Sequence, residues 1–223
     1  MERRLEISAA RLPGWVDRFA KGHPGTTAEV EVDRLHLRAP DGARAHLNAW
    51  PGARPPAGPQ SPPGGAGIGD WAELGRWAAG PDALAIVLVR RGGWSVGMAS
   101  GEELVRHRTG RRYVQSRTAA GGWSQQRFAR RRGNQSDALV ARVATAMAEL
   151  WAAAEVTPSG LVLGGDRALA AGVLEEMPEL ARRTLTAVPR REFYDLPDPR
   201  LVVLRTALAR ARSAVIDVLD PTR

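Results

Sequence analysis

The chain has 223 residues, 43% of them hydrophobic, and a formal net charge of +8. This length can bury one sizeable core with an appendage, and the absence of cysteine excludes disulfides, thiolate nucleophiles and cysteine-bound zinc. No uncharged run approaches the length of a membrane span, and the start lacks the apolar core of a signal peptide, so we expect a cytoplasmic protein.

Residues 1–80 are predicted to form an N-terminal extension. An amphipathic opening is expected from Ile7 to Phe19. Apolar and polar residues then alternate in three stretches joined partly by a turn at Asp41-Gly42, which is typical of a β-hairpin. The expected strand residues are 28–32, 35–37 and 45–50.

The extension ends in a segment rich in proline and glycine and a short helix. Proline and glycine dominate residues 51–69, and such a composition predicts a flexible loop because it cannot repay its ordering entropy. A helix is expected over residues 70–79, with Asp70 as its cap and one apolar side that comprises Trp71, Leu74 and Trp77.

Residues 81–223 are predicted to form the main domain, which begins with an antiparallel meander. The apolar run from Leu84 to Val89 suits a strand buried on both faces. Gly92-Gly93 predicts a hairpin turn into a strand over residues 94–98. Two further strands are expected at 104–108 and 112–117, with a turn at Thr109-Gly110.

Helices and strands are then expected to alternate, which indicates an α/β domain. Apolar residues at helical spacing predict a long helix over residues 124–155, which Gly133-Asn134 could kink or split. The elements expected after it are a strand at 161–163, a helix capped by Asp166, a strand at 184–188 and a helix that Asp198-Pro199 begins.

Positive charge is concentrated between Leu104 and Ser136, a run with nine arginines and no acidic residue. Since +8 for the chain less +9 for this run leaves −1, the rest of the sequence is nearly neutral. The glycine pair Gly121-Gly122 lies inside the run and precedes two glutamines. This pattern suits an amide held against a phosphate-rich partner, for which RNA is the natural candidate.

The motif at residues 121–132, Gly-Gly-Trp-Ser-Gln-Gln-Arg-Phe-Ala-Arg-Arg-Arg, resembles the GGQ loop and following helix of the eukaryotic and archaeal peptide-chain release factor. Residues 160–165 are similar to the strand and turn after that helix. The stretch from Arg90 to Gln126 resembles more closely the actinobacterial branch of the Vms-like release-factor family. The likeness covers roughly residues 84–219. It implies an α/β fold of the ribonuclease-H-like type, a mixed sheet with flanking helices.

The resemblance implies hydrolysis of the ester that joins a nascent peptide to tRNA, at the peptidyl-transferase centre of stalled ribosomes or large subunits. The implied partners are the large subunit with its 23S-type rRNA and peptidyl-tRNA; a monomer without cofactor, metal or membrane attachment is expected. Rescue is favoured over stop-codon termination because no codon-reading domain is evident.

The candidate catalytic residues follow from the same motif. Trp123 stands directly after the glycines, where the release factor has its glutamine, so Gln125 is the expected catalytic residue, with Gln126 in reserve. Gly121 and Gly122 would let this tip enter a narrow RNA-lined site. The candidate RNA-binding residues are Arg112, Arg117, Trp123, Ser124, Arg127, Arg130, Arg131 and Arg132.

Several alternatives remain open at the level of sequence. Trp123 is equally a base-stacking platform or an anchor packed on its own domain. The chain could also be a non-catalytic RNA-binding or ribosome-binding module, or a nuclease acting on tRNA ends. Four aspartates could form a nuclease cluster: Asp195, Asp198, Asp217 and Asp220. Their positions favour a helix cap and a polar C-terminal tail instead. His107 is expected to be an ordinary surface residue.

Overall fold

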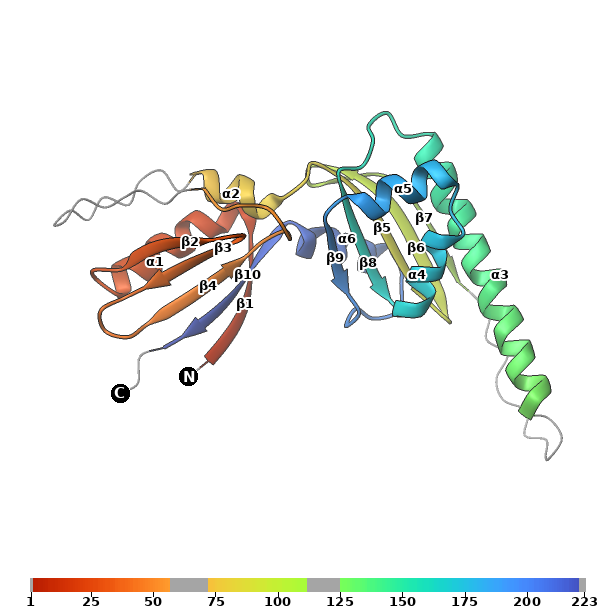
Figure 1. Cartoon of the computed structure of the whole chain (residues 1–223), viewed down its shortest axis with the longest axis horizontal. Helices are drawn as coiled ribbons and strands as arrows, with labels where there is room; N and C mark the ends of the chain where they lie inside the picture. The colour runs from red at the N-terminus through yellow and green to blue at the C-terminus, as the bar shows by residue number, and fades with distance from the viewer. Residues whose placement is uncertain (1, 57–71, 112–124, 221–223) are drawn as a thin grey trace. The chain divides into compact units, whose positions relative to one another are not determined.

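The computed structural model describes residues 2–56, 72–111 and 125–220, with the backbone alone for Ala72 and residues 125–134. Two compact units are formed, each with its own five-stranded sheet (Figure 1). Unit 1 comprises Met1–Pro81 and Ala209–Arg223, and unit 2 comprises Asp82–Leu208. Residues 209–223, which are expected in the main domain from the sequence, therefore belong to unit 1 instead.

Unit 1 contains an antiparallel sheet with the strand order β1-β10-β4-β3-β2. The three expected hairpin strands are confirmed as β2, β3 and β4, whereas β1 and β10 were not predicted. The expected polar C-terminal tail is wrong at Asp217, since β10 contains it and directs Ala214, Ile216 and Val218 into the core. The strands are β1 (Glu2–Ser8), β2 (Thr27–Glu31), β3 (Arg34–Arg38), β4 (Arg44–Asn48) and β10 (Ser213–Leu219).

One face of this sheet is covered by helices (Figure 1). They are the short 3-10 helix η1 (Ala9–Arg11), α1 (Leu12–Gly22) and α2 (Ala72–Ala79). Leu12 and Leu74 from the helices are fully buried with Leu35 and Leu47 from the sheet. The helix expected before residue 80 is confirmed from Ala72 onward; Asp70, Trp71 and most of the proline-rich segment lie outside the described residues.

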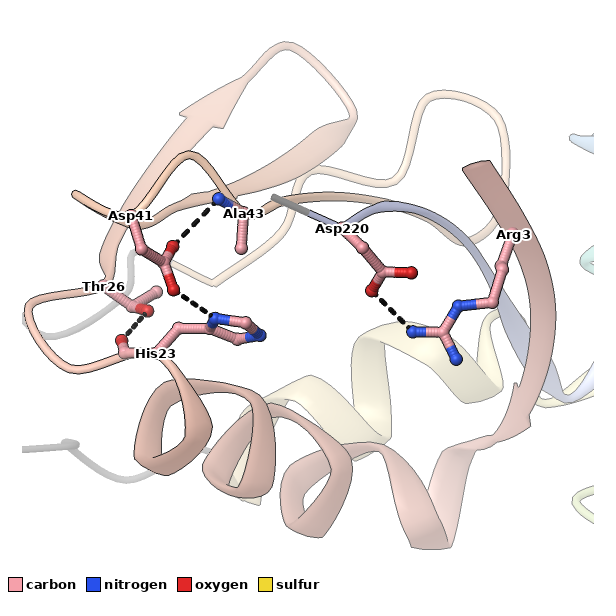
Figure 2. A network of polar contacts seen from close by, with 6 residues as sticks. All are labelled: Arg3, His23, Thr26, Asp41, Ala43 and Asp220. Atoms are coloured by element: carbon pink, nitrogen blue, oxygen red, sulfur yellow. Dashed lines mark hydrogen bonds and ion pairs between the residues drawn. The ribbon is translucent and has the colours of Figure 1, made fainter. Parts of the chain in front are cut away.

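Polar contacts fix the ends of these elements (Figure 2). His23, the C-terminal capping residue of α1, lies with its Nδ1 2.7 Å from Oδ2 of Asp41. The other oxygen of Asp41 accepts the backbone N–H of Ala43 at 2.9 Å. Asp41 thereby joins the end of α1 to the turn between β3 and β4. Separately, Arg3 of β1 donates to Asp220, just after β10, at 2.7 Å.

Unit 2 contains a mixed sheet with the strand order β7-β6-β5-β8-β9. The strands β5, β6 and β7 are antiparallel neighbours, so three strands of the expected meander are confirmed, whereas the fourth, expected at 112–117, lies outside the described residues. β8 and β9 continue the sheet in parallel from β5. The mixed α/β class is confirmed, and the ribonuclease-H-like assignment stays a prediction. The strands are β5 (Ala83–Arg90), β6 (Gly93–Ser100), β7 (Glu103–Arg111), β8 (Gly160–Gly165) and β9 (Arg190–Phe193).

Helices pack on both faces of this sheet because β5 is apolar on both sides. Val87 joins a core with Val143 and Met147 of α3, and α4 and α5 add to the same core. On the opposite face, Leu204 of α6 lies close to Gly97 of β6. Every residue of β5 except Arg90 is buried, as predicted. The helices are α3 (Gln125–Ala152), α4 (Arg167–Glu175), α5 (Glu179–Ala187) and α6 (Leu201–Ala211).

Two expectations about the helices of unit 2 are resolved. The long helix α3 runs without a break through Gly133-Asn134, so the expected split is absent in the described backbone. The expected cap of α4 is confirmed, because one oxygen of Asp166 accepts the backbone N–H groups of Ala168 and Leu169 at 3.0 and 3.1 Å.

The turn expected at Thr109-Gly110 is wrong, since both residues lie inside β7. Gly110 pairs with Trp94 of β6, and a Cβ atom added at Gly110 would lie 2.4 Å from the Trp94 indole. The glycine therefore provides space for a buried ring and does not mark a change of chain direction.

The strand expected at residues 184–188 is also wrong, because residues 179–187 form α5. The β-branched residues Thr184 and Thr186 are accommodated by hydrogen bonds from their hydroxyls to the carbonyls of Leu180 and Arg182, each at 2.9 Å. Ala181 and Leu185, one helical turn apart, are both buried. Tertiary burial thus overrides the local β preference.

Replacing Gly110 by alanine is expected to lower the free energy of unfolding by about 1–3 kcal/mol, because the new methyl group overlaps the Trp94 indole. Gly172 in α4 is the matched control. A Cβ there makes only ordinary contacts with Val140 at 3.5 Å, so Gly172→Ala should raise stability by about 0.5–1 kcal/mol. Urea unfolding of both variants gives the sign, and destabilisation of equal size in both would contradict this account.

The hydrogen bond between His23 and Asp41 is expected to break in acid. This bond, followed by that from the Ala43 N–H, holds the pKa of Asp41 below its usual 3.8. Its contribution to stability is therefore present above pH 3.8 and disappears as the pH falls through the folded-state value. Carbon NMR titration of the Asp41 carboxyl should show its pKa rising toward 3.8 in His23→Ala. The control Arg3→Ala, which breaks the ion pair with Asp220 in Figure 2, should leave the Asp41 pKa unchanged.

Candidate nucleic-acid interface

The predicted catalytic segment joins β7 to α3. Gly121, Gly122, Trp123 and Ser124 lie outside the described residues, as do the candidate RNA-binding residues Arg112 and Arg117. The described chain ends at Arg111 in β7 and resumes at Gln125, the first residue of α3. Gln125 and Gln126 therefore both occupy the first turn of a helix, where backbone N–H groups lack intrahelical partners.

The helix α3 is long enough to carry its first turns well away from the core. Its 28 residues correspond to a length of about 42 Å. The first buried side chain of its described part is Leu139. Figure 1 shows the first turns of α3 continuing past the end of the sheet. The backbone of four candidate RNA-binding residues lies in these turns: Arg127, Arg130, Arg131 and Arg132.

The strand β7 is the exposed edge of the sheet in unit 2 and carries basic side chains. Arg106, His107, Arg108 and Arg111 are all exposed. Arg108 forms an ion pair with Glu149 of α3, in which both side chains are about half exposed, so the pair stabilises the fold little. Arg106 and Arg111 have no carboxylate partner among the described residues. They are therefore available to a polyanion.

The register of the sheet brings several chain segments to the edge at which β7 ends. Arg111 pairs with Gly93 at the start of β6, and Arg90 pairs with the same glycine at the end of β5. Gly165 at the end of β8 lies beside Val89 of β5. The ends of β5, β7 and β8 therefore lie along one edge of the sheet, the edge that runs across the strands, where α4 also starts.

A cleft lies at this edge. Its volume is about 380 Å³, and we call it the strand-end cleft; it is lined by Arg90, Arg91, Gly92, Gly165, Asp166 and Asp198. Asp198 was expected to cap the next helix, but α6 begins only at Leu201, with the carbonyl of Arg200 accepting the N–H of Leu204. The cap prediction is therefore wrong, and no pattern in the neighbouring residues indicates that this carboxylate lines a cleft.

A second cleft of about 400 Å³ adjoins the first, between α3 and α4. The two share Arg91 and Asp166, but the second also contains Asp137, Glu175 and Glu176. Its acidic lining repels phosphate, so a nucleic-acid strand at this edge would be directed toward the strand-end cleft.

A tyrosine and an arginine stand beside the strand-end cleft. Arg90 donates through Nη2 to the carbonyl of Tyr194 at 3.2 Å. Arg167, the first residue of α4, stacks on the Tyr194 ring at 4.5 Å. Burial, with Glu192 as the next cause, raises the pKa of the Tyr194 hydroxyl above its usual 10.0. Tyr194 is thus a neutral platform for the arginine at working pH.

The aspartates considered for a nuclease do not form a cluster. Asp195 and Asp198 belong to unit 2, and Asp217 and Asp220 to unit 1. Within residues 2–56, 72–111 and 125–220, no three histidine, aspartate or glutamate side chains lie together as ligands for a metal. In the same part of the chain, no helix is long and apolar enough to cross a membrane.

The chain matches a family model and is similar to solved structures. The family model described as "Actinobacteria/chloroflexi VLRF1 release factor" (acVLRF1) matches residues 82–217, beginning at the first residue of unit 2. A solved structure titled "Vms1 mitochondrial localization core" has a TM-score of 0.41 and 10% sequence identity, and covers 91% of this chain and 81% of that one. Comparison with the curated proteins gives no match.

Removing a charge from β7 should weaken binding of single-stranded RNA in a salt-dependent way. Log affinity falls as log salt rises. For Arg106→Gln and Arg111→Gln we expect this fall to become shallower, by about 0.7 in slope for each phosphate that the variant no longer neutralises. Fluorescence anisotropy over a salt series measures this slope. The control Arg205→Gln removes the same charge from an exposed position on α6 and should leave the slope unchanged. If all three variants behave alike, β7 has no special part in binding.

Proposed function

Because the chain belongs to the Actinobacteria/chloroflexi VLRF1 release-factor family, as the resemblance predicted, we propose that it rescues ribosomes by hydrolysing peptidyl-tRNA. The proposed substrate is the ester between a nascent peptide and the terminal adenosine of tRNA, on stalled ribosomes or large subunits in the cytoplasm. The observation that carries the proposal is the family match over unit 2 together with two glutamines in the first turn of α3, just after the glycine pair.

The reaction requires little chemistry from the protein itself. Water adds to the ester carbonyl carbon, the bond to the ribose oxygen breaks, and a proton from the water ends on that oxygen. A neutral carboxamide can position the water and donate to the departing oxygen without adding charge. We assign this role to Gln125, with Gln126 as the alternative. The free N–H groups and positive dipole of the α3 N-terminus favour the oxyanion formed on the carbonyl.

Basic residues around the segment support a partner rich in phosphate. The described arginines Arg106 and Arg111 precede the glycine pair, and the first turns of α3 carry four more arginines. We propose that these residues contact 23S-type rRNA and tRNA, with the ribosome enclosing the reacting ester. Gly121 and Gly122 would then allow the tip to enter a narrow RNA-lined site.

Substitution of the glutamines tests the proposal. Purified protein is incubated with stalled ribosome–nascent-chain complexes, and peptidyl-tRNA, free peptide and tRNA length are resolved on one gel. We expect Gln125→Ala to slow peptide release by about 100-fold or more while ribosome binding is kept, because one transition-state donor is removed. Gln126→Ala should have a smaller effect.

The control is Gln135→Ala, which makes the same change at an exposed glutamine further along α3 and should release peptide normally. Co-sedimentation with ribosomes but persistence of peptidyl-tRNA in every lane would identify a binding module instead. Shortened tRNA would identify a nuclease. Either result would overturn the proposed hydrolase.

A further inference from the structure

The strand-end cleft contains an arginine whose hydrogen-bonding capacity is only partly used. Arg90 is held by its bond to the Tyr194 carbonyl, yet its Nε atom is buried and has no hydrogen-bond partner. Arg90 lines the cleft, and no described carboxylate forms an ion pair with it. A largely buried cation without a counter-charge is costly, and an anion in the cleft would lower that cost. The unpaired guanidinium thus indicates an anionic ligand.

A second arginine is free at the same place. Arg91 is exposed in the turn between β5 and β6 and lines the cleft, and no described carboxylate pairs with it. Gly92 leaves room above the cleft, because a Cβ there would contact only Oδ2 of Asp198, at 3.9 Å, whereas Gly165, with φ +94°, is required because the Val89 carbonyl oxygen lies 2.2 Å from where its Cβ would be. Backbone and guanidinium groups can therefore both approach a ligand closely.

The cleft is not simply basic, because it also presents carboxylates. Asp166 uses one oxygen to cap α4, whereas the side chain of Asp198 makes no hydrogen bond within the described chain. A ligand that fits must therefore combine an anionic acceptor for the arginines with a hydroxyl donor for Asp198. The ribose–phosphate backbone of RNA has both groups next to each other, and DNA lacks the 2′-hydroxyl.

We propose that the strand-end cleft binds one ribose–phosphate unit of RNA, with Arg90 and Arg91 on the phosphate and Asp198 accepting the 2′-hydroxyl. The inference rests on the proposed function and adds to it a site that distinguishes RNA from DNA. Its position is appropriate, since the chain leaves β7 for the glycine pair at the same edge, next to Gly93. RNA held there would lie at the base of the catalytic segment.

The test compares binding of a short single-stranded RNA of mixed sequence with binding of DNA of the same sequence. Arg91→Gln should weaken binding of both about tenfold, because it removes a charge-assisted hydrogen bond to phosphate. Its control, Arg183→Gln, removes one charge from an exposed position on α5 and should change neither. Arg90→Lys keeps the charge but loses the planar guanidinium with its several donors, and should also weaken RNA binding.

Asp198→Ala distinguishes binding of ribose in this cleft from nonspecific electrostatic attraction of the protein to any polyanion. We expect it to lower RNA affinity about tenfold without lowering DNA affinity, which removes the preference for RNA. Equal weakening for RNA and DNA, or Arg91→Gln indistinguishable from Arg183→Gln, would overturn the inference.

The release assay keeps this result distinct from the proposed hydrolysis. If wild-type protein releases peptide but the cleft variants bind RNA as wild type does, the RNA site in the cleft is refuted and the proposed hydrolysis is kept. If the cleft variants lose the preference for RNA but wild-type protein releases no peptide, the RNA site is supported and the proposed hydrolysis is refuted.

Discussion

Burial of β5 on both faces is the constraint on which the rest of unit 2 depends. A strand that is apolar on both sides must lie inside a sheet with helices on each face, and β5 has β6 on one side and β8 on the other. The antiparallel partner and the parallel partner bring different chain ends to one edge. The arginines at the end of β5, the end of β7 and the start of α4 therefore lie at the same end of the sheet.

Acidic residues neutralise the positive charge at some places along this edge and not at others. Glu149 pairs with Arg108, and Asp137, Glu175 and Glu176 line the cleft between α3 and α4. Arg90, Arg91, Arg106 and Arg111 lack such partners among the described residues. Phosphate is therefore repelled from the cleft between the helices more than from β7 or from the strand-end cleft, where two arginines balance two aspartates.

Sequence patterns mislead where a residue has a role that depends on a distant partner. Gly110 suggests a turn, because the Trp94 ring that requires its missing side chain lies on another strand. Thr184 and Thr186 suggest a strand, although their hydroxyls bond within α5. Asp198 suggests a cap, and nothing in its neighbours along the chain indicates the cleft. β1 and β10 are not predicted because they pair with each other although they lie at opposite ends of the sequence.

The sequence by itself determined the family, the mixed α/β class, the buried central strand, the long helix and the basic run with its glycines and glutamines. These features are local: they depend on apolar periodicity, composition and a short motif, which neighbouring residues define. Only the tertiary structure decided that the last strand belongs to unit 1, and that Arg90, Arg91 and Asp198 line one cleft. Strand pairing and cleft formation join residues far apart in the chain, and no local pattern records which distant partner will complete them.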